Sequence, residues 1–251
     1  MEQFSLGKVL GTGFRVWFRN LVPFLAITTI IYAPFLIWAL MIVHGNPPME
    51  TLGKDLQRLN SASLVLVPLL NILVSSALVY GVVMELKGEH ASMFRCLGTG
   101  LSRFFPVLGV TLLTMLAVIG GALLLIVPGL IIACMLYVTT GVAVLERPGL
   151  FGALARSSAL TAGHRWAIFG LLLILSVINY VLTKGTGHLF VLSPQMTETE
   201  VRELVQRYIH VDLARAVLVG SLSSVMSSSA YYYLRLEKEG TSAGELARVF
   251  E

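Results

Sequence analysis

The segment LVPFLAITTIIYAPFLIWALMIV occupies residues 21–43, and its polar interruptions are Thr28 and Thr29. A helix needs about 20 apolar residues to cross the hydrocarbon core of a bilayer. Five further apolar runs follow, at residues 62–84, 104–127, 130–145, 166–182 and 213–234. The sequence therefore predicts an all-α fold, a polytopic bundle of six transmembrane helices.

The composition points to the same class of protein. Hydrophobic residues make up 56% of the 251 residues, and charged residues only 13%. A water-soluble chain of this length cannot bury so much apolar surface and keep a polar exterior. The net charge of +4 fits the excess of Lys and Arg in cytoplasmic loops of membrane proteins, so no nucleic-acid partner is expected.

Lys and Arg residues are divided unequally between the two sides of the predicted bundle. Twelve of the 18 lie in the termini and in the loops after the second and fourth spans, and six lie on the other side. Because cytoplasmic loops carry the excess of positive charge, both termini are expected in the cytoplasm.

The motif LGTG occurs at residues 10–13 and again at 97–100, each time between basic residues and ahead of an aromatic pair. A weaker copy precedes the fifth span. We interpret the chain as one membrane domain, residues 1–251, with an internal pseudo-threefold repeat. Its predicted units are residues 1–84, 89–146 and 149–234, followed by a tail at 235–251.

Each unit is expected to begin with a short amphipathic helix that lies in the membrane interface. Aromatic residues such as Phe14, Trp17 and Phe18 would rest among the lipid headgroups. The small residues of LGTG would let this helix press closely against a neighbouring helix.

The third and fourth spans are separated only by Pro128–Gly129, which predicts a turn between two antiparallel helices. These two residues also belong to a wider pattern, in which a Glu ends the fourth span and an A-x-x-R-S-x-x-L-x-x-G helix follows. The helix pattern is formed here by Ala153, Arg156, Ser157, Leu160 and Gly163.

Over about residues 104–175 the chain resembles bacterial six-span membrane proteins, namely the membrane domain of some glycerophosphoryl diester phosphodiesterases and the YciC-like family. The resemblance implies a helical bundle in the cytoplasmic (inner) membrane of a bacterium. It does not imply phosphodiesterase activity, which belongs to a soluble barrel domain that the sequence does not contain.

Two carboxylates, Glu85 and Glu146, end the second and fourth spans at equivalent positions. Acids at such depths can bind a cation or relay protons. The favoured interpretation is that each one caps or tethers the adjoining interfacial helix, as a pair between Glu146 and Arg156 would do.

Basic residues on the cytoplasmic side are candidates for binding anionic lipid headgroups, each contributing about 1 kcal/mol near the surface. The candidates are Lys8, Arg95, Arg156 and Arg165. The alternative, slightly favoured, is a general positive bias without a specific ligand.

The sixth span is rich in serine, with small residues such as Gly220, Ser224 and Ser228 at four-residue spacing. This pattern favours close helix packing in the bundle core or in an oligomer. The alternative is a hydrophilic path for a substrate. The candidate core or path-lining residues are Asn71, Ser75, Asn179, Ser224 and Ser228.

Two amphipathic segments, residues 49–59 and 197–210, are expected to lie as helices over the opposite mouth of the bundle. Catalytic and metal-binding motifs are missing from the sequence: it has no HExxH, GxSxG or phosphate-loop pattern, and its histidines are scattered. Cys96 and Cys134 form no CxxC or Cys/His cluster, so neither a disulfide nor a metal or other cofactor is expected.

The sequence thus predicts a non-enzymatic membrane protein, a scaffold or accessory subunit that binds lipid, a protein partner or a second copy of itself. The alternative is a transporter or permease-like component for a small amphiphilic molecule. That alternative requires a polar cavity beside Asn71 and Ser224.

Overall fold

The computed structural model describes residues 4–45, 48–89, 91–188, 193 and 196–249. Within these ranges the chain is helical and has no strand, which confirms the predicted all-α class. The helices are α1 (Leu6–Arg19), α2 (Leu21–His44), α3 (Met49–Leu86), α4 (Met93–Ser102), α5 (Phe104–Leu124), α6 (Ile126–Met135), α7 (Thr139–Leu145), α8 (Leu150–Thr161), α9 (Arg165–His188) and α10 (Glu198–Val249). Six segments are long and apolar enough to cross a membrane, the fourth formed by α6 and α7 together.

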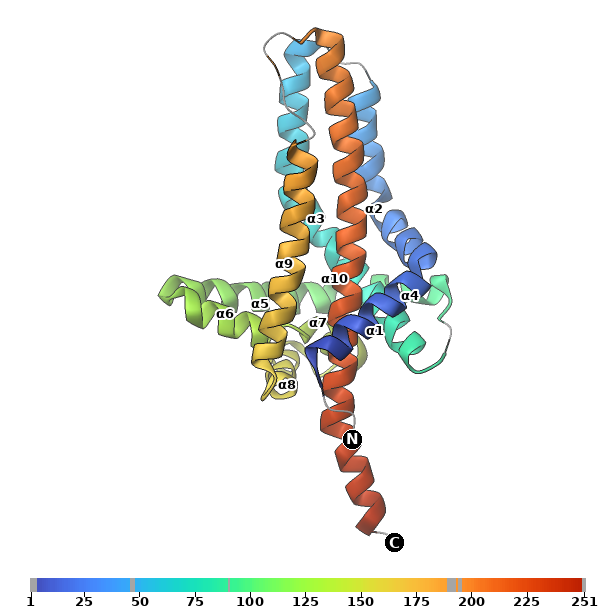
Figure 1. Cartoon of the computed structure of the whole chain (residues 1–251), viewed down its shortest axis with the longest axis vertical. Helices are drawn as coiled ribbons and strands as arrows, with labels where there is room; N and C mark the ends of the chain where they lie inside the picture. The colour runs from blue at the N-terminus through green and yellow to red at the C-terminus, as the bar shows by residue number, and fades with distance from the viewer. Residues whose placement is uncertain (1–3, 46–47, 90, 189–192, 194–195, 250–251) are drawn as a thin grey trace.

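Four helices share one direction. Helices α2, α3, α9 and α10 run along the long axis of the molecule, and the short helices α1, α4 and α8 gather beside its lower half (Figure 1). The beginning of the chain lies against the C-terminal part of α10, because the backbone N–H of Phe4 donates to the Glu237 carboxylate at 2.6 Å. The two ends of the described chain therefore lie at the same end of the molecule.

Helices α5 and α6 form an antiparallel hairpin that runs across the other four long helices (Figure 1). Its tip is five consecutive apolar residues, from Leu123 to Val127, with exposed fractions of 64–83%. The expected pair of antiparallel helices is present, but it runs in a different direction from the other long helices. If the four aligned helices cross the bilayer, the hairpin lies along the membrane plane.

The turn of this hairpin is not at Pro128–Gly129, so that prediction was wrong. Leu125 alone is extended between α5 and α6, with φ −163° and ψ 150°. Pro128 lies in the first turn of α6, where a missing N–H costs no helical hydrogen bond. A Cβ atom on Gly129 would come within 2.8 Å of the Cβ of Ala122 in α5. Proline and glycine therefore start the second helix and bring it close to the first.

The two amphipathic segments expected over the mouth do not lie there as separate helices. They are the first turns of α3 and α10, continuous with the spans that follow. No glycine or proline lies between residues 198 and 219, so nothing interrupts helical hydrogen bonding. A capping box begins α10: the Glu200 carboxylate accepts from the Thr197 N–H at 2.7 Å, and the Thr197 hydroxyl accepts from the Glu200 N–H at 3.4 Å. We refer to residues 49–62 and 198–212 as the stalk.

Helix α1 is anchored on α10 rather than lying only among lipids. Val9 and Trp17 of this helix are buried, as is Phe4 just before it, and the Trp17 indole N–H donates to the Ser221 hydroxyl at 3.0 Å. Phe18 is 64% exposed. Part of the predicted apolar stripe therefore packs against protein, and the rest faces outward.

The second glycine of each LGTG motif makes the close helix contact that the sequence suggests. A Cβ on Gly13 would come within 2.6 Å of the Met226 sulfur in α10, and one on Gly100 within 3.0 Å of the Ala77 Cβ in α3. At the first glycine of each motif, a Cβ would meet nothing within 4 Å. In each motif, therefore, only the second glycine needs to lack a side chain for the helix to pack against its neighbour.

Other features also recur between the predicted units. Ser5 and Ser92 each cap the following helix, with the side chain accepting an N–H three residues later. Gly88 and Gly149 both have positive φ, 83° and 81°. The unit boundaries stay a prediction, and residues 1–3 and 250–251 lie outside the described chain.

We expect Gly100→Ala to destabilise the protein by about 1–3 kcal/mol, because the added methyl group meets α3 at a tightly packed position. Gly98→Ala is the matched control on the same helix, and it should be neutral or stabilising by up to about 1 kcal/mol. Thermal unfolding of both variants in one detergent measures the difference. Equal midpoints would show that α4 does not dock on α3 as described.

The direction of the α5–α6 hairpin can be tested with Leu125→Cys, after Cys96 and Cys134 are replaced by alanine. A hairpin along the membrane plane keeps this cysteine in lipid, so a membrane-impermeant maleimide should not label it from either side. Arg58→Cys in the stalk is the control and should be labelled. Labelling of both cysteines from the same side would mean that α5 and α6 cross the bilayer.

Candidate functional site

An open cavity of about 560 Å³ lies between helices of the bundle, and we refer to it as the serine cavity. Its wall combines residues from α2, α3, α9, α10 and the region of α7. Hydroxyl and amide groups dominate the polar part of this wall. They belong to Tyr32, Asn71, Ser75, Tyr137, Thr140, Ser176, Asn179, Ser223, Ser224 and Ser227.

The small residues of α10 create this space. The Ser224 hydroxyl lies 3.0 Å from that of Ser75 in α3 and also bonds to its own helix, at the Gly220 carbonyl oxygen, at 2.9 Å. Such back-bonding lets serine occupy an apolar helix. A Cβ on Gly220 would come within 3.1 Å of the Asn71 amide oxygen and 3.9 Å of the Tyr32 hydroxyl. Glycine at this position therefore leaves room for the polar groups of α2 and α3.

Helix α9 closes the serine cavity from the side. It packs against α10, α6 and α1 rather than closely against α3. Ser176 and Asn179 on α9 and Asn71 and Ser75 on α3 consequently line opposite parts of the same cavity. A polar space of this kind lies at the depth of the apolar segments, where lipid offers no hydrogen bonds.

Two tyrosine hydroxyls in the cavity wall are buried without a hydrogen-bond partner among the described residues. They are those of Tyr32 in α2 and Tyr137 between α6 and α7. A buried hydroxyl without a partner costs about 1–3 kcal/mol. Each hydroxyl oxygen is enclosed by protein atoms, so a bond to a molecule in the cavity requires a movement of the tyrosine side chain.

The sequence-based candidates divide clearly. Asn71, Ser75, Asn179 and Ser224 all line the serine cavity. Ser228 does not: it is fully buried, and its hydroxyl donates to the Ser224 carbonyl oxygen at 2.6 Å. Ser224 and Ser228 are one helical turn apart on nearly the same face of α10, so cavity lining and close packing occur at successive turns of one helix.

Sequence reasoning missed Tyr32, Tyr137 and Arg215. Tyr32 is a single hydroxyl-bearing ring within a long apolar run, and Arg215 is a charge just inside the sixth span. A charged residue in such a segment is by itself a signal of function. Arg215 should therefore have been selected from the sequence.

Arg215 is held in a defined position at the edge of the serine cavity. Its Nε and one terminal nitrogen donate to the same oxygen of Asp212, at 2.9 and 2.6 Å. Its other terminal nitrogen donates to the Asn179 side-chain oxygen at 3.1 Å. Two of its five N–H donors remain for another partner.

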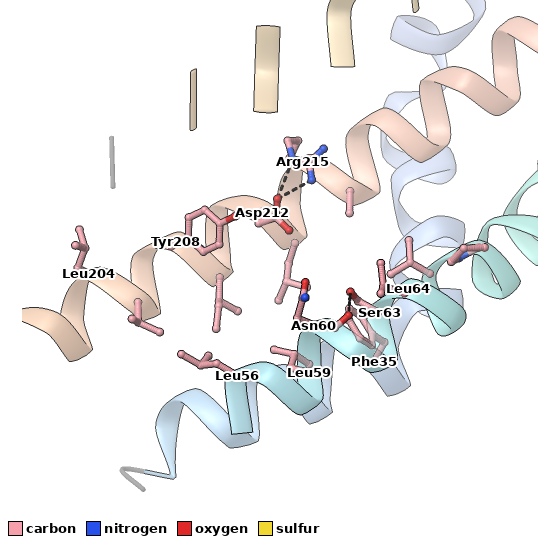
Figure 2. A pocket seen from close by; sticks show the side chains of 16 residues that line it. Phe35, Leu56, Leu59, Asn60, Ser63, Leu64, Leu204, Tyr208, Asp212 and Arg215 are labelled. Atoms are coloured by element: carbon pink, nitrogen blue, oxygen red, sulfur yellow. Dashed lines mark hydrogen bonds and ion pairs between the residues drawn. The ribbon is translucent and has the colours of Figure 1, made fainter. Parts of the chain in front are cut away.

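A second cavity, of about 660 Å³, lies next to the first between α3 and α10. Figure 2 shows Leu56 and Leu59 of α3 on one side and Leu204 and Tyr208 of α10 on the other. Most of its lining residues are apolar, and the Arg215–Asp212 pair lies at its edge. We refer to this space as the apolar groove.

At the end that holds the termini, the predicted carboxylates take part in ion pairs. Glu146 pairs with Arg156 at 2.8 Å and accepts a hydrogen bond from the Tyr231 hydroxyl, also at 2.8 Å. Glu85 pairs with Arg19 at 3.4 Å. Glu146 tethers the adjoining helix α8, as the sequence favours, whereas Glu85 pairs with α1, which does not adjoin the second span.

A third carboxylate of this kind, Glu237, was missed. It accepts from the Phe4 N–H and lies 3.1 Å from the ring of His164. Its signal is visible in the sequence, since Leu-Glu followed by a basic residue occurs both at residues 145–147 and at 236–238. The same three-residue pattern thus closes the second predicted unit and follows the third, at the start of the tail.

The basic candidates are not gathered into one site. Lys8 lies over the ring of Tyr233 at 5.2 Å, while Arg95 and Arg165 are exposed on different helices. Arg156 also bonds to Glu239. Although partial burial opposes its charge, its bonds to Glu146 and Glu239 raise the pKa of Arg156 above the ordinary value. Arg156 is therefore already paired within the protein.

Both cysteines are buried free thiols, and no group of three metal-ligating side chains is found in the described ranges. Comparison with protein-family models, with curated proteins and with solved structures found no match. Function is therefore inferred from the residues of this chain alone.

We expect Glu146→Ala to lower the free energy of unfolding by about 1–3 kcal/mol, because Arg156 and Tyr231 both lose a bond to it. Glu85→Ala is the matched control at the equivalent position. Its partner Arg19 is 69% exposed, so the loss should stay below about 1 kcal/mol. Thermal unfolding in detergent compares the two. A larger loss for Glu85→Ala would contradict the tethering role assigned to Glu146.

Proposed function

We propose that this protein binds a small amphiphilic molecule within its bundle and acts as a transporter or permease-like component of a membrane. The observation that carries the proposal is the serine cavity, with two unpartnered tyrosine hydroxyls in its wall. A scaffold needs only a dry, small-residue core at this place. A cavity lined by hydroxyl and amide groups serves a ligand instead.

The size and chemistry of the cavity support this proposal. Its volume of about 560 Å³ is within the range of small-molecule sites, which are commonly about 300–1,000 Å³. Polar residues inside a membrane domain are costly and commonly mark substrate paths. The charge asymmetry of the loops supports a cytoplasmic membrane location with both termini in the cytoplasm.

The scaffold function is the second candidate, favoured by a different observation. The α5–α6 hairpin exposes a continuous apolar tip. Arg95 of α4 and Arg165 of α9 are exposed elsewhere on the molecule. Such a surface suits lipid acyl chains and anionic headgroups. This role does not need the serine cavity, so the two functions are separable by experiment.

The cavity function predicts that water and small solutes reach Ser223. In a background without Cys96 and Cys134, we expect Ser223→Cys to react with a hydrophilic thiol reagent about ten-fold or more faster than Ser228→Cys. Both positions are serines of α10, but only Ser223 lines the cavity. Leu173→Cys, which is exposed on α9, controls for lipid-facing cysteines.

A second variant tests whether the route is the cavity itself. Gly220→Leu should slow the labelling of Ser223→Cys, because its side chain enters the space beside Asn71. Circular dichroism and the thermal midpoint report whether each variant folds. If Ser223→Cys and Ser228→Cys react at equal rates in folded protein, the proposed function is wrong.

A further inference from the structure

The serine cavity and the apolar groove meet at three residues that line both, Val67, Arg215 and Ala216. Val67 lies on α3, and the other two lie one residue apart on α10. The two spaces are therefore neighbours along the same pair of helices. Arg215 is the only charged side chain among these three residues.

The polarity of the two spaces is inverted relative to the rest of the molecule. The serine cavity is the more polar of the two, yet it lies along residues 215–227 of α10, within the apolar span. The groove is mostly apolar, yet it extends along residues 56–68 of α3 and so from the stalk into the span. At a rise of 1.5 Å per residue, this stretch of α3 is roughly 18 Å long.

Charge is also divided between the two spaces. Arg215 is the one charged residue that lines the serine cavity, whereas Asp212 lines only the groove. In a site surrounded by protein and lipid, a guanidinium binds carboxylate or phosphate oxygens strongly. The Asp212 carboxylate would repel the same oxygens from the groove. An anionic group is thus favoured on the serine side of Arg215.

We infer that the two spaces form one site for an amphiphile with an anionic head, a carboxylate or a phosphate, and an apolar tail. The head binds Arg215 at the edge of the serine cavity, beside Asn179. The tail lies in the apolar groove between Leu59 and Leu204. This inference names the ligand class for the proposed function and rests on it.

Binding of matched probes tests this site. The protein is placed in phosphatidylcholine nanodiscs and titrated with dodecyl phosphate, dodecanoate and dodecanol, with empty nanodiscs correcting for partition into lipid. The two anionic probes should bind about ten-fold or more tightly than dodecanol. Inorganic phosphate, which lacks a tail, should bind at least about ten-fold more weakly than dodecyl phosphate.

Variants assign the head and the tail separately. Arg215→Gln should remove the preference for anionic probes and leave dodecanol binding unchanged. Asp212→Asn, which removes the other member of the ion pair, should keep or increase that preference. Ser63→Trp fills the groove and should weaken dodecyl phosphate binding while leaving inorganic phosphate binding unchanged. Arg215→Lys replaces Arg215→Gln if the glutamine variant does not fold, and should keep a reduced preference.

Three results overturn the inference. If dodecanol binds as tightly as the anionic probes, Arg215 does not bind an anionic head group. Inorganic phosphate binding as tightly as dodecyl phosphate would exclude the tail in the groove, and binding of no probe would exclude both. If Ser223→Cys is still labelled selectively in these cases, the proposed function stands and only the ligand class is wrong.

Discussion

The structure depends on one constraint, that a backbone polar group in lipid must find its hydrogen bond within the protein. Long uninterrupted helices are the consequence. Helix α10 continues from Glu198 through the apolar span to Val249, and α3 continues from the stalk through Pro68. Short breaks between helices occur where a side chain supplies the missing hydrogen bond. At Asn20, for example, the side-chain amide donates to the Val16 carbonyl oxygen. The positions of such breaks decide how the other helices are arranged.

The same constraint explains what could be predicted from the sequence. Apolar runs had to be helices, and serines at four-residue spacing had to lie where α10 meets other helices. The small residues of LGTG predicted a close helix contact, and the structure shows that the second glycine makes it. Local signals such as the Thr197–Glu200 capping box are set by neighbouring residues alone. These features need no knowledge of the tertiary arrangement.

The remaining features depend on that arrangement. Pro128 and Gly129 suit a turn, but they also suit the first turn of a tightly packed helix, and only the fit to Ala122 decides between them. The direction of the α5–α6 hairpin likewise depends on its packing against α3, α7 and α8. The serine cavity could be foreseen only as one of two alternatives. The cavity exists because α9 does not pack closely against α3. No local sequence pattern predicts the distance between these two helices.

The continuity of α10 joins two regions that are far apart. Toward its N-terminal end the helix carries the ion pair Asp212–Arg215. Toward its C-terminal end it carries a second ion pair, Arg235–Glu239, at 2.6 Å. A helix without a proline behaves as a nearly stiff rod over this length. A small tilt imposed at the stalk therefore displaces the ion-paired end in the opposite direction. If ligand binding tilted α10 at the stalk, the ion-paired end of the same helix, beside the first residues of the described chain, would move as well.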